Sequence, residues 1–115
     1  MRVVLTLFLA SLLFGCSSPE PGIFQVDAGE LKPTGAVLEL YGVESPMEQN
    51  GKIFVGRRSV KNDGSGKIIV NFEGKPPIIC HIGYVTGGFQ YRLEYKIENG
   101  KCKMTRMLLD ADAPA

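Results

Sequence analysis

The clearest alternation of apolar and polar residues covers residues 89–98. Every second residue in this stretch is apolar or aromatic, namely Phe89, Tyr91, Leu93, Tyr95 and Ile97. The residues between them are polar or charged, namely Gln90, Arg92, Glu94, Lys96 and Glu98. Because successive side chains of a strand point to opposite faces, this pattern predicts an antiparallel strand with one buried face and one solvated face.

The dipeptide that follows, Asn99-Gly100, is the one preferred in a two-residue type I′ hairpin turn. A hairpin closed by Glu98 and Lys101 would place most apolar residues opposite one another, so the turn and the apolar face favour a single register. One pair, Arg106 with Leu93, does not fit this pattern. The apolar pairs predicted in this register are Ile97 with Cys102, Tyr95 with Met104, and Tyr91 with Leu108.

Shorter apolar patterns predict further strands, separated by segments rich in Gly, Pro, Asn and Asp. The predicted strands cover residues 23–28, 36–43, 52–60, 67–73 and 78–85, and the predicted turns and loops cover residues 32–35, 44–51, 61–66 and 74–77. The loop at 61–66 is expected to connect a hairpin. In the strand at 78–85, the period of two places Ile78, Cys80, Ile82 and Tyr84 on one face.

Together these elements predict an all-β fold, a small antiparallel β-sandwich or barrel of about six or seven strands. The chain contains 14 Gly and 7 Pro among 115 residues, which favours turns and strands over long helices. We expect a single domain over residues 23–109, followed by a disordered tail at 110–115.

A separate apolar run covers residues 3–14, follows Arg2 and ends at Gly15-Cys16. It is shorter than the roughly 20 residues that a membrane-spanning helix needs and has the features of a secretory signal. The sequence Leu13-Phe14-Gly15-Cys16 resembles the lipobox of bacterial lipoprotein precursors. This resemblance implies that residues 1–15 are a cleaved signal peptide and that Cys16 carries acyl chains. An ordinary cleaved signal with a chance cysteine is the alternative.

Residues 16–22 are small, polar and rich in proline, as expected for a flexible tether between a lipid anchor and a domain. In a Gram-negative cell, Ser17 after the lipidated cysteine resembles the sorting pattern for the outer membrane. We therefore expect a protein held by lipid in the cell envelope, facing the periplasm in that case.

The two remaining cysteines, Cys80 and Cys102, are expected to form a disulfide because an exported chain enters an oxidising compartment. Two free core thiols are the alternative. In a flat meander the strand at 89–98 would separate the cysteines by two strand spacings, about 10 Å, which is too far for a disulfide. A disulfide therefore favours a sandwich or small barrel over one flat sheet.

Charge gives no argument for nucleic acid as a partner. The chain has 13 Lys and Arg against 12 Asp and Glu, and loss of Arg2 with the signal would make these numbers equal. The densest basic cluster is Arg57, Arg58 and Lys61. It is a candidate surface for anionic lipid headgroups, lipopolysaccharide or an acidic partner, or else a solvated strand end.

Catalytic and metal-binding signals are weak. His81 is the single histidine, and no serine or cysteine with a supporting carboxylate is visible beside it in the sequence. Cys80, His81 and Cys102 match no standard zinc spacing. Glu39, Glu73 and Glu94 lie on predicted strands, so a pair of catalytic carboxylates of the kind that glycosidases use remains an alternative. We predict no enzymatic activity, no cofactor and no metal.

The predicted function is therefore binding. We expect a lipid-anchored accessory protein that engages another envelope protein or an incoming protein, by pairing at a sheet edge or by loop contact. An inhibitor or exclusion factor against a foreign enzyme or phage is one alternative. A carrier or sensor for a small apolar ligand, with Phe and Tyr lining a barrel interior, is the other; a filled core would count against it.

Overall fold

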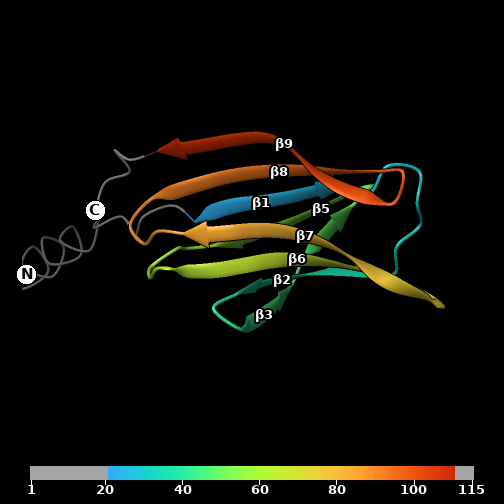
Figure 1. The fold of residues 1–115 in the computed structure, drawn as a ribbon, viewed down its shortest axis with the longest axis horizontal. Coiled ribbons are helices and arrows are strands. Elements are labelled where there is room, and N and C mark those ends of the chain that lie inside the picture. Colours follow the sequence, from blue (N-terminus) through green and yellow to red (C-terminus); the bar gives the residue numbers. More distant parts are fainter. Residues whose placement is uncertain (1–20, 111–115) are drawn as a thin grey trace, which may run out of the picture.

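The computed structural model describes residues 21–110, which fold into two packed β-sheets (Figure 1). This confirms the predicted all-β sandwich, with nine strands in the described part of the chain instead of six or seven. The strands are β1 (Gly22–Asp27), β2 (Gly35–Leu40), β3 (Val43–Pro46), β4 (Glu48–Asn50), β5 (Ile53–Arg58), β6 (Gly64–Phe72), β7 (Lys75–Val85), β8 (Gln90–Glu98) and β9 (Lys101–Asp110).

The strand order is β4-β5-β1-β8-β9 in the five-stranded sheet and β3-β2-β6-β7 in the four-stranded sheet. Neighbouring strands are antiparallel except for β1 and β8, which run parallel, with Phe24 paired with Leu93. β1, the first strand in the sequence, therefore lies in the middle of its sheet, between β5 and β8.

The core lies between the sheets and follows the period of two in each strand. In β1 and β2 every second residue is buried. The sheets approach closely at Gly56, where an added Cβ would lie 2.9 Å from Leu38 Cδ2. The largest fully buried side chains are Phe24, Phe54, Leu38, Leu40, Ile68, Val26, Val70 and Val85.

The predicted strand at 36–43 and the predicted loop at 44–51 are both wrong in their bounds. β2 ends at Leu40, because Tyr41 (φ 55°) and Gly42 (φ 75°) form a turn that reverses the chain into β3. β3 pairs with β2, and β4 pairs with β5 in the other sheet. Met47, the residue between them, is buried and its N–H donates to the Ala36 carbonyl (2.9 Å). The segment thus crosses between the sheets instead of forming a loop.

The predicted hairpin around residues 61–66 is also wrong. β5 and β6 belong to different sheets, so the segment between them crosses the sandwich edge. Val60 is buried in this crossing, and its carbonyl accepts from the Gly88 N–H (3.0 Å). Alternation shows which face of a strand is buried but not which strand is its neighbour, and two successive strands need not pair.

Residues 74–77 were expected to break the chain, yet Pro76 and Pro77 lie inside β7. Proline lacks an N–H, and β7 tolerates it as the outermost strand of its sheet. Near its other end, β7 has a register shift beside Gly83 (φ 80°). The shift turns Tyr84 outward, 70% exposed, and Val85 inward. The expectation that Tyr84 shares a face with Cys80 is therefore wrong.

The β8–β9 hairpin confirms the first part of the predicted register. Asn99 (φ 53°) and Gly100 (φ 75°) form the turn, and the pairs at this end include Ile97 with Cys102 and Tyr95 with Met104. A bulge at Thr105 then shifts the register by one residue. Beyond it the pairs are Glu94 with Arg106, Leu93 with Met107, Arg92 with Leu108, and Tyr91 with Leu109.

The bulge corrects the two predicted pairs of Tyr91 with Leu108 and Leu93 with Arg106. It places Arg106 opposite the carboxylate residue Glu94 instead of the apolar Leu93, and the Thr105 hydroxyl donates to the Glu94 carbonyl (3.2 Å). The physical reason for the shift is that a regular register would place Arg106 on the core-side face opposite Leu93, whereas the bulge moves it to the outer face opposite Glu94.

The predicted signal peptide, Cys16, most of the predicted tether and residues 111–115 of the predicted tail lie outside the described residues. The domain was predicted to end at 109, and β9 includes Asp110. In the described part of the chain, no helix is long and apolar enough to cross a membrane.

Candidate interaction surface

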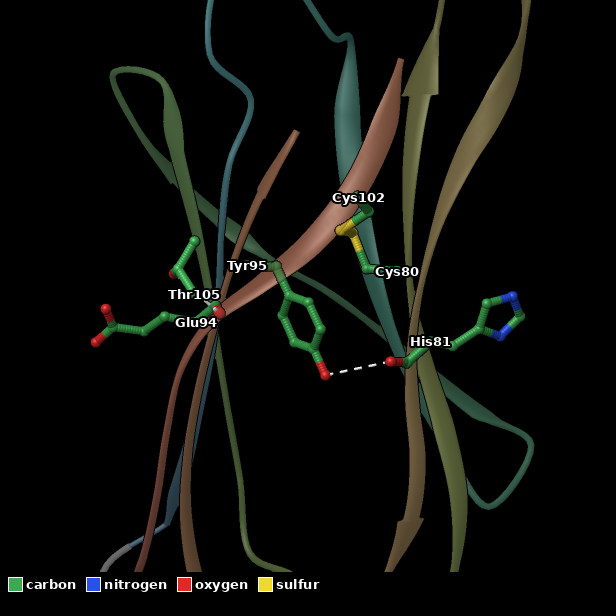
Figure 2. Close-up of a disulfide and its surroundings, with 6 residues drawn as sticks. All are labelled: Cys80, His81, Glu94, Tyr95, Cys102 and Thr105. Carbon is green, nitrogen blue, oxygen red and sulfur yellow. Dashed lines mark hydrogen bonds between the residues drawn. A yellow bond between two sulfur atoms is a disulfide. The ribbon is translucent and has the colours of Figure 1, made fainter. Parts of the chain in front are cut away.

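A disulfide joins Cys80 on β7 to Cys102 on β9, with 5.3 Å between the Cα atoms. Because β7 and β9 belong to different sheets, the bond crosses the sandwich at one edge (Figure 2). The predicted disulfide is confirmed, and so is the inference that the cysteines meet across the core. The alternative of two free thiols is excluded.

Tyr95 makes a second link at the same edge. Its ring is buried, and its hydroxyl donates to the His81 carbonyl on β7 (3.3 Å; Figure 2). Burial raises the pKa of the Tyr95 phenol to about 12 from its ordinary value of 10.0. The hydroxyl therefore stays protonated and able to donate over the physiological range. The disulfide therefore ties the start of β9 to the four-stranded sheet, and the hydrogen bond ties the neighbouring strand β8 to the same sheet.

The rest of β9 is differently placed. β9 is the outermost strand of the five-stranded sheet, as Figure 1 shows, and β7 is the outermost strand of the other. Four large apolar side chains of β9 remain about half exposed. We call them the β9 strip: Met104 (45% exposed), Met107 (55%), Leu108 (46%) and Leu109 (46%).

The register divides the β9 strip between two faces. Met104, Met107 and Leu109 stand opposite the buried residues Tyr95, Leu93 and Tyr91 and so point to the core side of the sheet. Leu108 points to the outer face. Exposed apolar side chains on an unpaired sheet edge are typical of a surface that is covered by a partner.

The outer face of β9 is basic. It carries Lys101, Lys103 and Arg106, which are all exposed and which make no ion pair within residues 21–109. The nearby carboxylates of β8 bind cations of β8 itself instead: Glu94 pairs with Arg92 (2.9 Å) and Glu98 with Lys96 (3.5 Å). The edge thus combines an apolar core-side face with an outer face of unneutralised positive charge.

The basic cluster singled out from the sequence lies at the end of β5 and just beyond it. Arg57 forms an exposed ion pair with Glu48 (3.7 Å), while Arg58, the next residue along the strand, donates from Nη1 to the Val43 carbonyl (2.7 Å). Lys61 is exposed. Because Arg57 and Arg58 are successive strand residues, they point to opposite faces. The structure therefore places the three cations near one another in the chain without gathering them on one face.

His81 is exposed on the outer face of β7, and its imidazole points away from Tyr95 in Figure 2. The register places it beside Lys67, which pairs with Glu39 (3.8 Å). These residues border a depression of about 390 Å³ that is open to solvent. Glu94 lies in the opposite sheet and Glu73 follows β6, so the three candidate carboxylates are not brought together.

Among residues 21–110, no group of three or more His, Cys, Asp or Glu side chains is placed to hold a metal ion. Of the surface depressions in this part of the chain, the largest of those described has a volume of about 580 Å³ and includes Leu31, Phe72, Pro76 and Ile78 in its lining. It too is open to solvent. The tyrosines do not line a shared cleft: Tyr91 and Tyr95 are buried in the core, whereas Tyr84 is exposed.

The β9 strip was not predicted from the sequence. Its signal was the run of three apolar residues Met107, Leu108 and Leu109 at the end of a strand, where strict alternation would have one polar residue.

Comparison of the chain with protein-family models, with curated proteins and with solved structures finds no match.

Proposed function

We propose that this chain is a lipid-anchored cell-envelope protein that binds another envelope protein, or an incoming one, through the β9 edge. The observation that carries the proposal is the half-exposed β9 strip on an outermost strand. Soluble proteins usually protect such edges with short strands, charge or coverage. β9 carries cations and a bulge but still leaves its apolar strip about half exposed, and such an edge supports recognition by strand addition or by a contact with the apolar side chains.

The anchor is proposed at Cys16. Two or more acyl chains give stable membrane attachment, and residues 16–21 can span at most about 20 Å. β1 begins at Gly22 and runs parallel to β8, whereas β9 runs antiparallel to β8. The start of β1 and the end of β9 therefore share one end of the sandwich. Leu108 and Leu109 would then lie close to the membrane to which the tether leads.

Binding fits the described residues better than the other hypotheses do. His81 shares an open depression with Glu39 and Ser65, but within the described residues no hydrogen bond joins its imidazole to either side chain. The candidate carboxylates Glu39, Glu73 and Glu94 are separated. This arrangement gives no support to catalysis. The depressions open to solvent give no support to a carrier that encloses an apolar ligand. An inhibitor or exclusion factor would use the same edge and differ only in the identity of its partner.

Site-specific photocrosslinking in intact cells tests the proposal. A photoreactive residue in place of Met107 should give a discrete crosslinked product with another protein. The matched control is the same residue at Tyr84, which is also exposed but lies in the other sheet. Products of equal yield at both positions, or none at Met107, would show that the β9 edge is not the binding surface.

The anchor is tested separately by membrane fractionation. Wild-type protein should sediment with membranes, and Cys16→Ser should move it to the soluble fraction, since the acyl chains can no longer be attached. A Cys16→Ser protein that still sediments with membranes contradicts lipid anchoring, whatever the crosslinking shows.

A further inference from the structure

We infer that the partner supplies an extended segment with alternating apolar and acidic side chains, which adds to the five-stranded sheet as a strand beside β9. The inference rests on the proposed binding function and names the chemistry of the partner. Three features of β9 support it: its free backbone edge, its apolar core-side face and its basic outer face.

The first of these features is the free backbone edge of β9. β8 pairs with one side of β9 along its length, from Glu98–Lys101 to Gln90–Asp110. Within residues 21–110, no strand pairs with the other side. An extended segment placed there would satisfy the N–H and C=O groups of that side with a ladder on either side of the bulge at Thr105, and main-chain hydrogen bonds of this kind supply affinity without sequence specificity. Side chains must therefore supply the specificity.

On the core side, β9 offers Met104, Met107 and Leu109, all about half exposed. Apolar side chains at every second position of an added strand would lie beside them, where cross-strand apolar pairs are stabilising. Two of the three are methionines, whose flexible side chains adapt to differently shaped partners. This face therefore selects for apolar residues at alternate positions and tolerates variation among them.

On the outer face, Lys101, Lys103 and Arg106 have no ion pair within residues 21–109. Lys103 stands opposite another cation, Lys96, and like charges directly opposite each other are destabilising. Acidic side chains at the intervening positions of an added strand would neutralise these cations. Charge complementarity therefore favours an acidic partner and disfavours a second copy of β9, which would bring two sets of cations onto one face.

The test is a binding measurement on the full mature chain, purified in mild detergent, with fluorescently labelled ten-residue peptides followed by anisotropy. The probe is a peptide of alternating valine and glutamate. One control replaces every glutamate by lysine, and a second has five valines followed by five glutamates. We expect the alternating acidic peptide to bind at least about tenfold more tightly than either control, which corresponds to about 1.4 kcal/mol. Equal binding of the two glutamate peptides would overturn strand addition.

Two variants locate the peptide. Lys103→Glu should weaken binding of the acidic peptide by about fivefold or more, a loss of roughly 1 kcal/mol in charge interaction, and should improve binding of the lysine peptide. Lys32→Glu makes the same charge change at an exposed residue outside β9 and should leave both affinities unchanged. Equal weakening by both variants would show general charge attraction and overturn the inference. Circular dichroism verifies that each variant is folded.

The outcomes separate this inference from the proposed function. A crosslinked partner at Met107 in cells, together with no preference among the peptides, leaves the binding function standing and removes the acidic strand. A crosslinked product that proves to be this chain itself, with a dimer in native mass spectrometry, identifies a second copy as the occupant and likewise overturns the inference.

Discussion

The two halves of β9 contain similar residues but have different surroundings. Residues 101–104 follow the turn and are tied to the four-stranded sheet through the Cys80–Cys102 disulfide. Residues 106–110 follow the bulge at Thr105, and their apolar side chains are about half exposed. We call these the tied half and the free half. The two halves differ in how they are attached to the opposite sheet and not in the exposure of their apolar side chains, since Met104 in the tied half is as exposed as Leu108 and Leu109 in the free half.

One strand, β9, can therefore both stabilise the fold and offer a surface for binding. The tied half is positioned by its turn, its disulfide and the Tyr95 hydrogen bond behind it. Among the described residues the free half pairs with β8 alone, so it offers apolar surface on a backbone that is already held in the extended conformation. Such preorganisation reduces the entropy cost of binding.

The largest contrast is expected from alanine substitution on either side of the bulge. Ile97→Ala, at a buried residue of β8 that lies opposite Cys102 of the tied half, should lower the free energy of unfolding by about 3 to 4 kcal/mol through lost burial and a residual cavity. Met107→Ala in the free half should lower it by only about 0.5 kcal/mol. Chemical denaturation measures both, and equal losses would contradict the division into halves.

Removal of the disulfide should have the second-largest effect on the free energy of unfolding. Replacing both cysteines, Cys80→Ala with Cys102→Ala, should lower the free energy of unfolding by about 3 kcal/mol, because the separation of 22 residues sets the chain entropy restored to the unfolded state. Amide hydrogen exchange should accelerate more in residues 101–104 than in 106–110. If amide exchange accelerated equally in both halves, the disulfide would not be what holds the tied half in place.

Tyr95→Phe should lower the free energy of unfolding at neutral pH by about 1 kcal/mol, since one partly buried hydrogen bond is lost. It should also change the pH dependence. The folded state raises the pKa of Tyr95 to about 12 from 10.0, so the stability that goes with the protonated phenol is present below pH 10 and declines as the pH rises toward 12. Wild type should therefore lose more stability than the variant over that interval. Parallel curves for the two proteins would refute this.

The smallest effect is expected at the bulge itself. Thr105→Val removes the hydrogen bond from the Thr105 hydroxyl to the Glu94 carbonyl and should lower the free energy of unfolding by about 0.5 kcal/mol, because the site is exposed. The register on either side should persist, since Arg106 still lies opposite Glu94. Cross-strand nuclear Overhauser effects measure the register, and a return of Leu93 opposite Arg106 would show that the hydroxyl determines it.

Local sequence patterns predicted the tied half well. The alternation in residues 89–98, the Asn99-Gly100 turn and the pair of Ile97 with Cys102 all depend on neighbouring residues in the chain, and all are confirmed. The disulfide could be predicted as well, and with it the sandwich, because strand spacing in a flat sheet forbids the bond.

The other features of the fold depend on contacts between residues that are far apart in the sequence. No local pattern indicates that β1 pairs with β8, that β5 and β6 lie in different sheets, or that Met47 crosses between sheets. The register shifts at Thr105 and Gly83 arise from pairing across strands, and each changes which side chains face outward. The exposure of the free half could not be predicted for the same reason. It depends on β9 having no pairing strand on its other side within the described residues.

The central position of β1 has a consequence for the order of folding. β1 is the first strand of the described residues to be synthesised, yet its neighbour β8 follows about seventy residues later, as the pair of Phe24 with Leu93 shows. Pairing over such separations slows folding, which takes milliseconds to seconds in β-sandwiches. β1 can pair earlier with β5 on one side, but its other side stays unpaired until β8 is available. We expect folding to be completed only after β8 has emerged, so that truncation before residue 98 leaves a chain without its five-stranded sheet.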